Sequence, residues 1–119
     1  MSPERAKVFV AEDDKDWLDI IRGTLEGAGH SVVLSASTRA EALAAAERLR
    51  ELGVQVATVD GNLNDYESSG ADGQALLAAI RTHAPEVKTV GMSGLTVRGV
   101  DVNVGKSNAH NLGEVVKKL

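Results

Sequence analysis

Acidic side chains follow two apolar runs of the sequence at the points where each run ends. Three consecutive acids, residues 12–14, come directly after the run Lys7–Ala11, and Asp60 follows the run Val54–Val59. Carboxylates gathered in one place repel each other unless a cation lies among them. A hard divalent ion prefers oxygen ligands, and Mg²⁺ accepts a site with few carboxylates. If the fold brings these acids together, they therefore predict a Mg²⁺ site.

A hydroxyl and an ammonium group follow two further apolar runs. Ser93 comes after Val87–Met92, and Lys106 comes after Val100–Gly105. Together they could hold an oxyanion or a phosphoryl group against the metal ion. In such a site Asp60 would be the nucleophile.

The meeting of these residues depends on strand-like and helix-like segments that alternate along the chain. Strands are expected at Lys7–Ala11, Ser31–Ala36, Val54–Val59, Val87–Met92 and Val100–Gly105. Helices are expected over residues 16–26, from a capping box at Thr38 and Glu41 to Leu52, around Leu76–His83, and over residues 108–119 with Ser107 as the N-cap. This order predicts an α/β fold, a doubly wound parallel sheet with helices on both faces. Ligands of such folds bind beyond the carboxyl ends of the strands, where the residues described above are expected to lie.

Composition restricts the class of protein. The chain has 119 residues and a net charge of −4, which suits one domain over residues 1–119 with no separate output module. No basic cluster is present and Trp, Tyr and Phe occur once each, so we expect neither nucleic-acid nor membrane-surface binding. The absence of cysteine excludes disulfides, thiolate zinc sites and cysteine nucleophiles. No signal-peptide core or membrane-spanning run is found, so we expect a cytoplasmic protein.

Residues at four strand ends, taken together, resemble those of a known family. They are Glu12-Asp13, Asp60, Ser93-Gly94 and Lys106. In this order, and over nearly the whole chain, they resemble the CheY-like receiver domain of two-component response regulators. The resemblance implies a flavodoxin-like sheet of five parallel strands in the order 2-1-3-4-5. It further implies a stand-alone response regulator whose state is read by an unknown downstream protein or through a homodimer.

The resemblance also implies a role for each site residue. Asp60 would accept a phosphoryl group from the phosphohistidine of a sensor histidine kinase or a phosphotransfer protein. Ser93 would donate a hydrogen bond to one phosphoryl oxygen, and Lys106 would neutralise another. The implied Mg²⁺ ligands are Glu12, Asp13, Asp60 and the backbone carbonyl of Asn62. Such a protein is a signalling phosphoacceptor that catalyses only its own phosphorylation and dephosphorylation, and we do not expect an enzyme that acts on other substrates.

The chain departs most from the family between Ser93 and Lys106. The eight residues 93–100 are too few for a helical crossover, which ordinarily needs a dozen or more, so the family's fourth helix does not fit. Eight extended residues still reach about 26 Å, enough for a bare loop to join parallel strands. Valines alternate with Asp101 and Asn103 in residues 100–104, which indicates one face covered by the first and last helices and one face left open.

Three smaller departures concern the loops and the switch position. Asn64 and the polar residues 65–71 replace a shorter, proline-containing loop, and they predict either a lid or a tolerated surface loop. Ser107 follows Lys106 where the family usually has proline, so the direction of the lysine is not fixed in the usual way. Asn103 stands in the place of the family's aromatic switch residue, and the usual relay cannot operate through it.

Other interpretations of the acids are weaker, with one exception. The segment from Asp60 to Ala71 lacks the glycine and the final glutamate of a calcium-binding EF-hand loop. A haloacid-dehalogenase-like phosphatase would require a second Asp and a nucleophile after the first strand. Acids 12–14 could also be a solvated helix start. The alternative that stays open is a pseudo-receiver, in which the same scaffold binds proteins without phosphotransfer.

Overall fold

The computed structural model of the chain describes residues 5–61, 71–94 and 96–119. Its strands are β1 (Lys7–Ala11), β2 (Ser31–Ala36), β3 (Val56–Val59), β4 (Lys88–Gly91) and β5 (Val102–Asn103). Its helices are α1 (Lys15–Gly27), α2 (Arg39–Ala46), α3 (Ala71–His83), the 3-10 helix η1 (Lys106–Asn111) and α4 (Leu112–Lys117). All strand pairs are parallel and the sheet order is β2-β1-β3-β4-β5. The predicted fold class and strand order are therefore confirmed.

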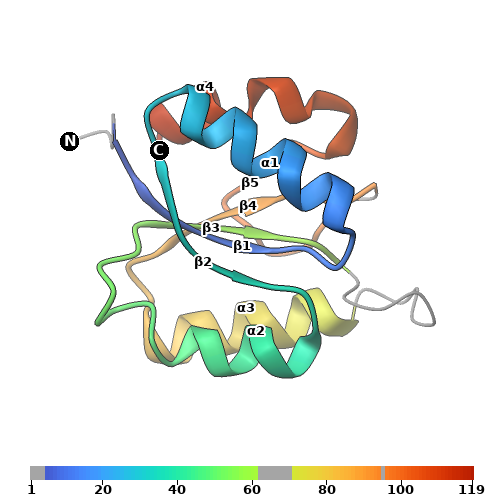
Figure 1. Ribbon diagram of the computed structural model, residues 1–119. Coiled ribbons are helices and arrows are strands. Elements are labelled where there is room, and N and C mark those ends of the chain that lie inside the picture. Colours follow the sequence, from blue (N-terminus) through green and yellow to red (C-terminus); the bar gives the residue numbers. More distant parts are fainter. Residues whose placement is uncertain (1–4, 62–70, 95) are drawn as a thin grey trace.

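Two helix layers cover the two faces of the sheet (Figure 1). Helices α1 and α4 pack on one face, where Ile21 and Leu112 belong to the same buried cluster as Val10 of β1. Helices α2 and α3 pack on the other face, where Leu49 and Leu76 are fully buried. Strand β3 is buried at all four positions, as expected for a central strand under helices on both sides.

Local signals in the sequence set the start of two helices. Asp14 caps α1 by accepting hydrogen bonds from the N–H groups of Asp16 and Trp17. Thr38 caps α2 by accepting from the N–H of Glu41, as the capping-box pattern predicts. The N-cap assigned to Ser107 is wrong, because this residue lies inside η1 and the regular turn of α4 begins only at Leu112.

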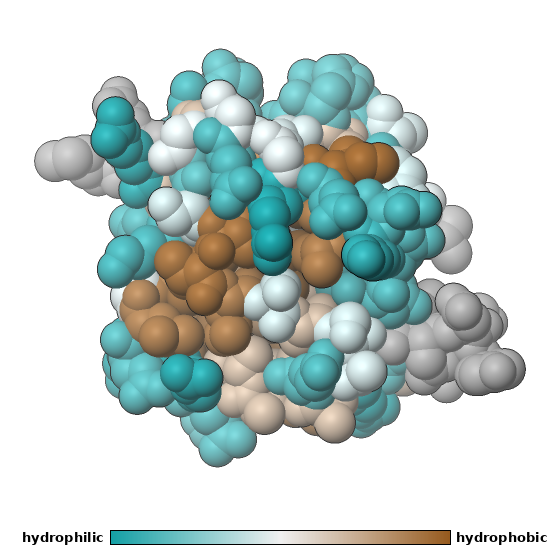
Figure 2. Space-filling view, viewed as in Figure 1, coloured by the Kyte–Doolittle hydropathy of each residue, from teal (hydrophilic) through white to brown (hydrophobic). Residues whose placement is uncertain are grey.

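Apolar side chains also reach the surface at one edge of the sheet. Val33 of β2 is 38% exposed, and its neighbours Val32 and Leu34 are only partly buried. Figure 2 shows a band of apolar side chains between the two helix layers on the face seen in Figure 1, along the sheet edge where β2 lies. Within the described parts of the chain, no helix is long and apolar enough to span a membrane.

The connection between β4 and β5 contains no helix in residues 92–94 and 96–101, which confirms the prediction of a loop. Strand β5 is shorter than predicted and comprises only Val102 and Asn103. Of the three alternating valines, Val102 and Val104 pack on the side of α1 and α4 as expected. Val100 packs on the opposite side, against the cluster under α2 and α3. The expected position of Val100 is therefore wrong, because the chain already turns at Gly99, where φ is +88°.

The face that the sequence left open is covered by residues 96–101, which we call the covering segment. Val97 is only 4% exposed and belongs to the cluster under α2 and α3. The carbonyl of Arg98 accepts a hydrogen bond from Nε2 of Gln74 at 2.8 Å, so the segment is attached to α3. The side-chain amide of Asn103 accepts from the N–H of Val97 at 2.9 Å and donates to its carbonyl at 3.0 Å. A loop therefore does part of the covering that a fourth helix would do.

Candidate functional site

The acidic residues of the site are positioned by the carboxyl ends of adjacent strands. Beyond the end of β1, the N–H of Glu12 donates to the carbonyl of Ala36 at 3.0 Å. Beyond the end of β3, the N–H of Asp60 donates to the carbonyl of Ala11 at 3.2 Å. These sheet-like bonds fix the backbone of both residues and direct their side chains to the same edge.

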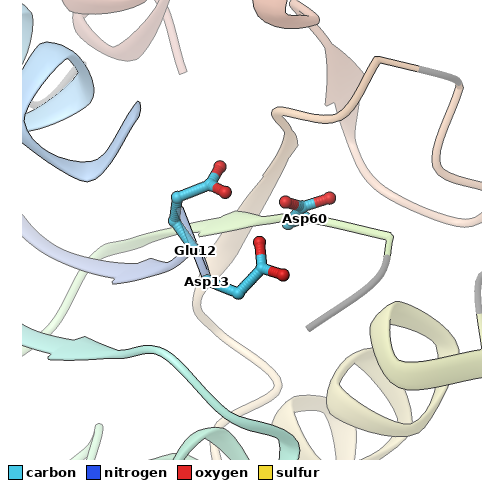
Figure 3. Close-up of side chains that lie close together, drawn as sticks. All are labelled: Glu12, Asp13 and Asp60. Atoms are coloured by element: carbon cyan, nitrogen blue, oxygen red, sulfur yellow. The ribbon is translucent and has the colours of Figure 1, made fainter. Parts of the chain in front are cut away.

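Three carboxylates point toward one another at this edge (Figure 3). One carboxylate oxygen from each of Glu12, Asp13 and Asp60 can be chosen so that the three atoms lie within 4.8 Å of one another. Glu12 is 1% exposed and Asp60 is 4% exposed, whereas Asp13 is partly buried. The structure thus brings together the acids that the sequence predicted to meet.

Lys106 reaches into the same cluster. Its Nζ atom lies 3.1 Å from Oδ2 of Asp60 and 3.3 Å from the carboxylate of Glu12. The cluster contains three carboxylates and this one ammonium group, so a formal charge of −2 remains if all four groups are ionised. Charge of this size in a buried place is unfavourable without a counterion or a proton.

The titration of Glu12 reflects this imbalance. The pKa of Glu12 is raised from 4.5 to about 8, first by burial and then by the hydrogen bond with Asp60 and the charge of Asp60, which together outweigh the lowering by the N–H of Asp14 and by Lys106. The pKa of Lys106 is raised, because attraction by Asp60 and Glu12 outweighs the opposing effect of burial. A proton on Glu12 is therefore one way in which the metal-free site reduces its excess charge.

A divalent cation is the other way, and the donor set fits it. The Oε1 atom of Glu12 is buried and accepts no hydrogen bond from the residues described, although Lys106 pairs with it electrostatically. Carboxylate oxygens are the ligands that Mg²⁺ prefers, and the number of protein ligands is small enough to leave places for water. The fourth predicted ligand, the carbonyl of Asn62, lies outside the described residues, as do Asn64 and most of the loop 65–71.

The hydroxyl residue follows β4 at the same edge. Ser93 is 8% exposed, and its carbonyl accepts a hydrogen bond from the N–H of Lys106 at 3.2 Å. The N–H of Gly105 donates to the carbonyl of Gly91 at 3.0 Å, and φ of Gly105 is +78°, a value that favours glycine. These contacts direct the backbone of Lys106 without a proline after it. The functional roles of Ser93 and Lys106 stay predictions.

Sequence reasoning missed two neighbours of the site. The ring of Trp17 lies beneath the lysine, with its centroid 5.6 Å from Nζ of Lys106. Gly73 in α3 lies so close to the site that a Cβ atom there would be 2.9 Å from the carbonyl oxygen of Asp60. The first could have been anticipated from its place one turn after the acids. The second depends on helix packing, which periodicity does not specify.

Comparison with known proteins identifies similar structures, although no protein-family model matches the chain and no curated protein matches it in sequence. A CheY-like response regulator receiver domain protein from Methanospirillum hungatei JF-1 superposes with a TM-score of 0.76 and 26% identity, over 96% of this chain and 92% of that one. The response regulator domain of Thermotoga maritima CheB gives 0.72 and 19%, over 96% and 95%.

A third similar structure is described as containing a phosphorylated residue and two ligands. It is a response regulator protein from Burkholderia pseudomallei described with a phosphorylated aspartic acid, a calcium ion and citrate. It superposes with a TM-score of 0.72 and 19% identity, over 94% of this chain and 66% of that one. At this identity the similarity concerns the fold alone.

Proposed function

We propose that this chain, which has the fold of CheY-like receiver domains, is the phosphoacceptor of a two-component phosphorelay. Asp60 would take a phosphoryl group from the phosphohistidine of a sensor histidine kinase or a phosphotransfer protein in the cytoplasm. The observation that carries the proposal is the geometry of Asp60, a buried carboxylate 3.1 Å from a lysine ammonium and within 4.8 Å of two other acids. An isolated surface aspartate would have none of these neighbours.

The proposed step needs one nucleophile and charge stabilisation. An oxygen of Asp60 attacks the phosphorus in line, the new P–O bond forms, and the P–N bond breaks with its electron pair left on the imidazole. Lys106 neutralises one of the phosphoryl oxygens, and the hydroxyl of Ser93 donates to another. Mg²⁺, held by Glu12, Asp13, Asp60 and the carbonyl of Asn62, would supply the remaining positive charge.

The proposal makes the protein a signalling component and not an enzyme with a separate substrate. Its only catalysed reactions would be its own phosphorylation and dephosphorylation. The result would be read by another protein or by self-association, for which a homodimer is the simplest arrangement.

A pseudo-receiver that binds proteins without phosphotransfer is the second candidate. It is favoured by one specific observation, the use of Asn103 to bind the backbone of Val97 in the covering segment. In this arrangement the side chain at the switch position is occupied by a structural contact. The acid cluster has no corresponding explanation under this second candidate, because buried charge that no reaction uses is costly.

Phosphorylation by a small donor distinguishes the two candidates. The protein is incubated with acetyl phosphate and Mg²⁺, and its intact mass is measured. We expect a gain of one phosphoryl group in the wild type and none in Asp60→Asn, while Asp19→Asn, an exposed change on α1, behaves as the wild type. The same chain should bind beryllofluoride in the presence of Mg²⁺. Absence of both effects in the wild type, or their persistence in Asp60→Asn, rejects phosphotransfer.

A further inference from the structure

The single tryptophan of the chain contacts the lysine of the site. Nζ of Lys106 lies 5.6 Å from the centroid of the Trp17 ring. This distance falls within the range over which a cation is attracted to the face of an aromatic ring, and tryptophan is the strongest of the aromatic residues in this respect. The ammonium thus contacts two charged groups and one neutral ring among the residues that the structure describes.

The ring is held in place independently of Lys106. The backbone N–H of Trp17 donates to Oδ1 of Asp14 at 3.1 Å, so the N-cap of α1 fixes the main chain that carries the ring. The side chain is partly buried and packs against the apolar cluster under α1 and α4. Helix cap and core together make the ring a preorganised surface.

The side chain of the lysine, in contrast, is long and intrinsically flexible. Its backbone N–H is bonded to the carbonyl of Ser93, but its side chain has four rotatable bonds and is 20% exposed. Ordering such a side chain costs conformational entropy, which its contacts must offset.

Phosphoryl transfer would remove one of these contacts. When an oxygen of Asp60 becomes part of the new P–O bond, the carboxylate loses its charge and the ion pair with Lys106 loses most of its attraction. The ammonium must then turn to a phosphoryl oxygen. The ring of Trp17 has no net charge before or after the reaction, so its attraction for the ammonium is unchanged.

From this geometry we infer that Trp17 is a positioning residue for Lys106. Its ring keeps the ammonium at the site while the lysine exchanges Asp60 for the transferred phosphoryl group. The inference rests on the proposed function, because only phosphotransfer requires the exchange. Trp17 offers no oxygen ligand, so the inference assigns it no direct part in holding a metal ion.

A double-mutant cycle tests the inference. Trp17→Leu should slow phosphorylation by acetyl phosphate about threefold to tenfold, and Trp17→Phe, which keeps an aromatic face, should slow it less. Ile20→Ala, which removes an exposed apolar side chain from the same helix, should leave the rate unchanged. In a Lys106→Met background, Trp17→Leu should have no further effect, because the residue acts through the lysine. An equal loss in both backgrounds would indicate a merely structural role and overturn the inference.

A second measurement does not depend on phosphorylation. Because Nζ of Lys106 lies over the ring, we expect the protons on the adjacent Cε atom to show an upfield ring-current shift by NMR, which Trp17→Leu abolishes and Ile20→Ala preserves. An unshifted signal in the wild type overturns the inference. If the shift is present but the wild type takes up no phosphoryl group, the proposed function fails and the positioning role falls with it, leaving only a structural contact.

Discussion

Replacement of Glu12 by glutamine should stabilise the protein in the absence of divalent cations. Glu12 is buried among carboxylates, and its pKa is raised to about 8, with burial as the largest cause and Asp60 as the next. Glutamine keeps the shape of the side chain but carries no charge, and its amide can donate a hydrogen bond to Asp60. The variant therefore loses its ion pair with Lys106 but removes a larger repulsion.

The effect should depend on pH in a direction that the pKa fixes. The pKa of Glu12 is 4.5 in the unfolded chain and about 8 in the folded protein. At a pH between these two values, Glu12 holds a proton in the folded state that the unfolded chain has released. Its contribution to stability is therefore complete below pH 4.5 and is lost as the pH rises through 8. Each pKa unit corresponds to about 1.4 kcal/mol, so the whole interval corresponds to at most about 4 to 5 kcal/mol. The attraction of Lys106 is already included in this pKa, and the interval from pH 5 to pH 8 covers most of the titration, so we expect Glu12→Gln to gain about 2 to 4 kcal/mol at pH 8 relative to its difference at pH 5.

Urea unfolding with a chelator present, followed by tryptophan fluorescence, measures this difference. The wild type, Glu12→Gln and the control Glu26→Gln, an exposed change on α1, are compared at pH 5 and pH 8. The advantage of Glu12→Gln should appear at pH 8, shrink at pH 5 and be reduced by added Mg²⁺, which stabilises only the protein that binds it. A variant less stable than the wild type at pH 8, or a difference that does not change with pH, would show that the acids do not repel as their positions indicate.

Three further outcomes are expected. Asp60→Asn should weaken Mg²⁺ binding about tenfold or more by calorimetry, because it removes one of three carboxylate charges; unchanged affinity would place the ion elsewhere. Gly73→Ala should destabilise the protein by about 1 to 3 kcal/mol and reduce phosphorylation, since the new Cβ atom would press on the backbone of Asp60. The control Gly23→Ala has open space around it and should be neutral or stabilising by up to about 1 kcal/mol. Gly91→Ala should release the covering segment, because its Cβ would overlap the side chain of Asn103; slow amide exchange at residue 97 in that variant would contradict this.

Periodicity and local signals were sufficient to predict most of the architecture. Strands β1 and β2 have the predicted bounds, and the capping box at Thr38 starts α2. The alternation of elements, with the family resemblance, specified a parallel sheet and thereby the edge at which Glu12, Asp60 and Lys106 meet. These features follow from patterns within a few residues of each other, which sequence displays directly.

Two errors, at Val100 and Asn103, concern how the connection after β4 packs on the rest of the fold. Asn103 was expected to face an open surface, but its amide binds the backbone of Val97. The two residues can meet because Gly91 has no side chain that would occupy the space beside them. Burial of Val97 depends on a space left by an absent helix, and no local pattern predicts which loop residue fills such a space. A glycine in β4 was the one available signal, since a glycine within a strand often marks the close approach of another group.

The arrangement of the site explains why the fourth helix can be absent while the acids remain. The described site residues follow β1, β3, β4 and β5, and the connection between β4 and β5 supplies the site only with Ser93 at its very start. Shortening this connection removes covering surface, of which Val97 and Val100 restore a part, but removes no carboxylate and no lysine. In this fold, the residues that would carry out the chemistry therefore do not depend on the surface that the fourth helix would form. The acid cluster therefore bears only on phosphoryl transfer. A measurement at Asp60 can settle whether the chain is phosphorylated. The partner must instead be sought through the surface that the short connection between β4 and β5 forms.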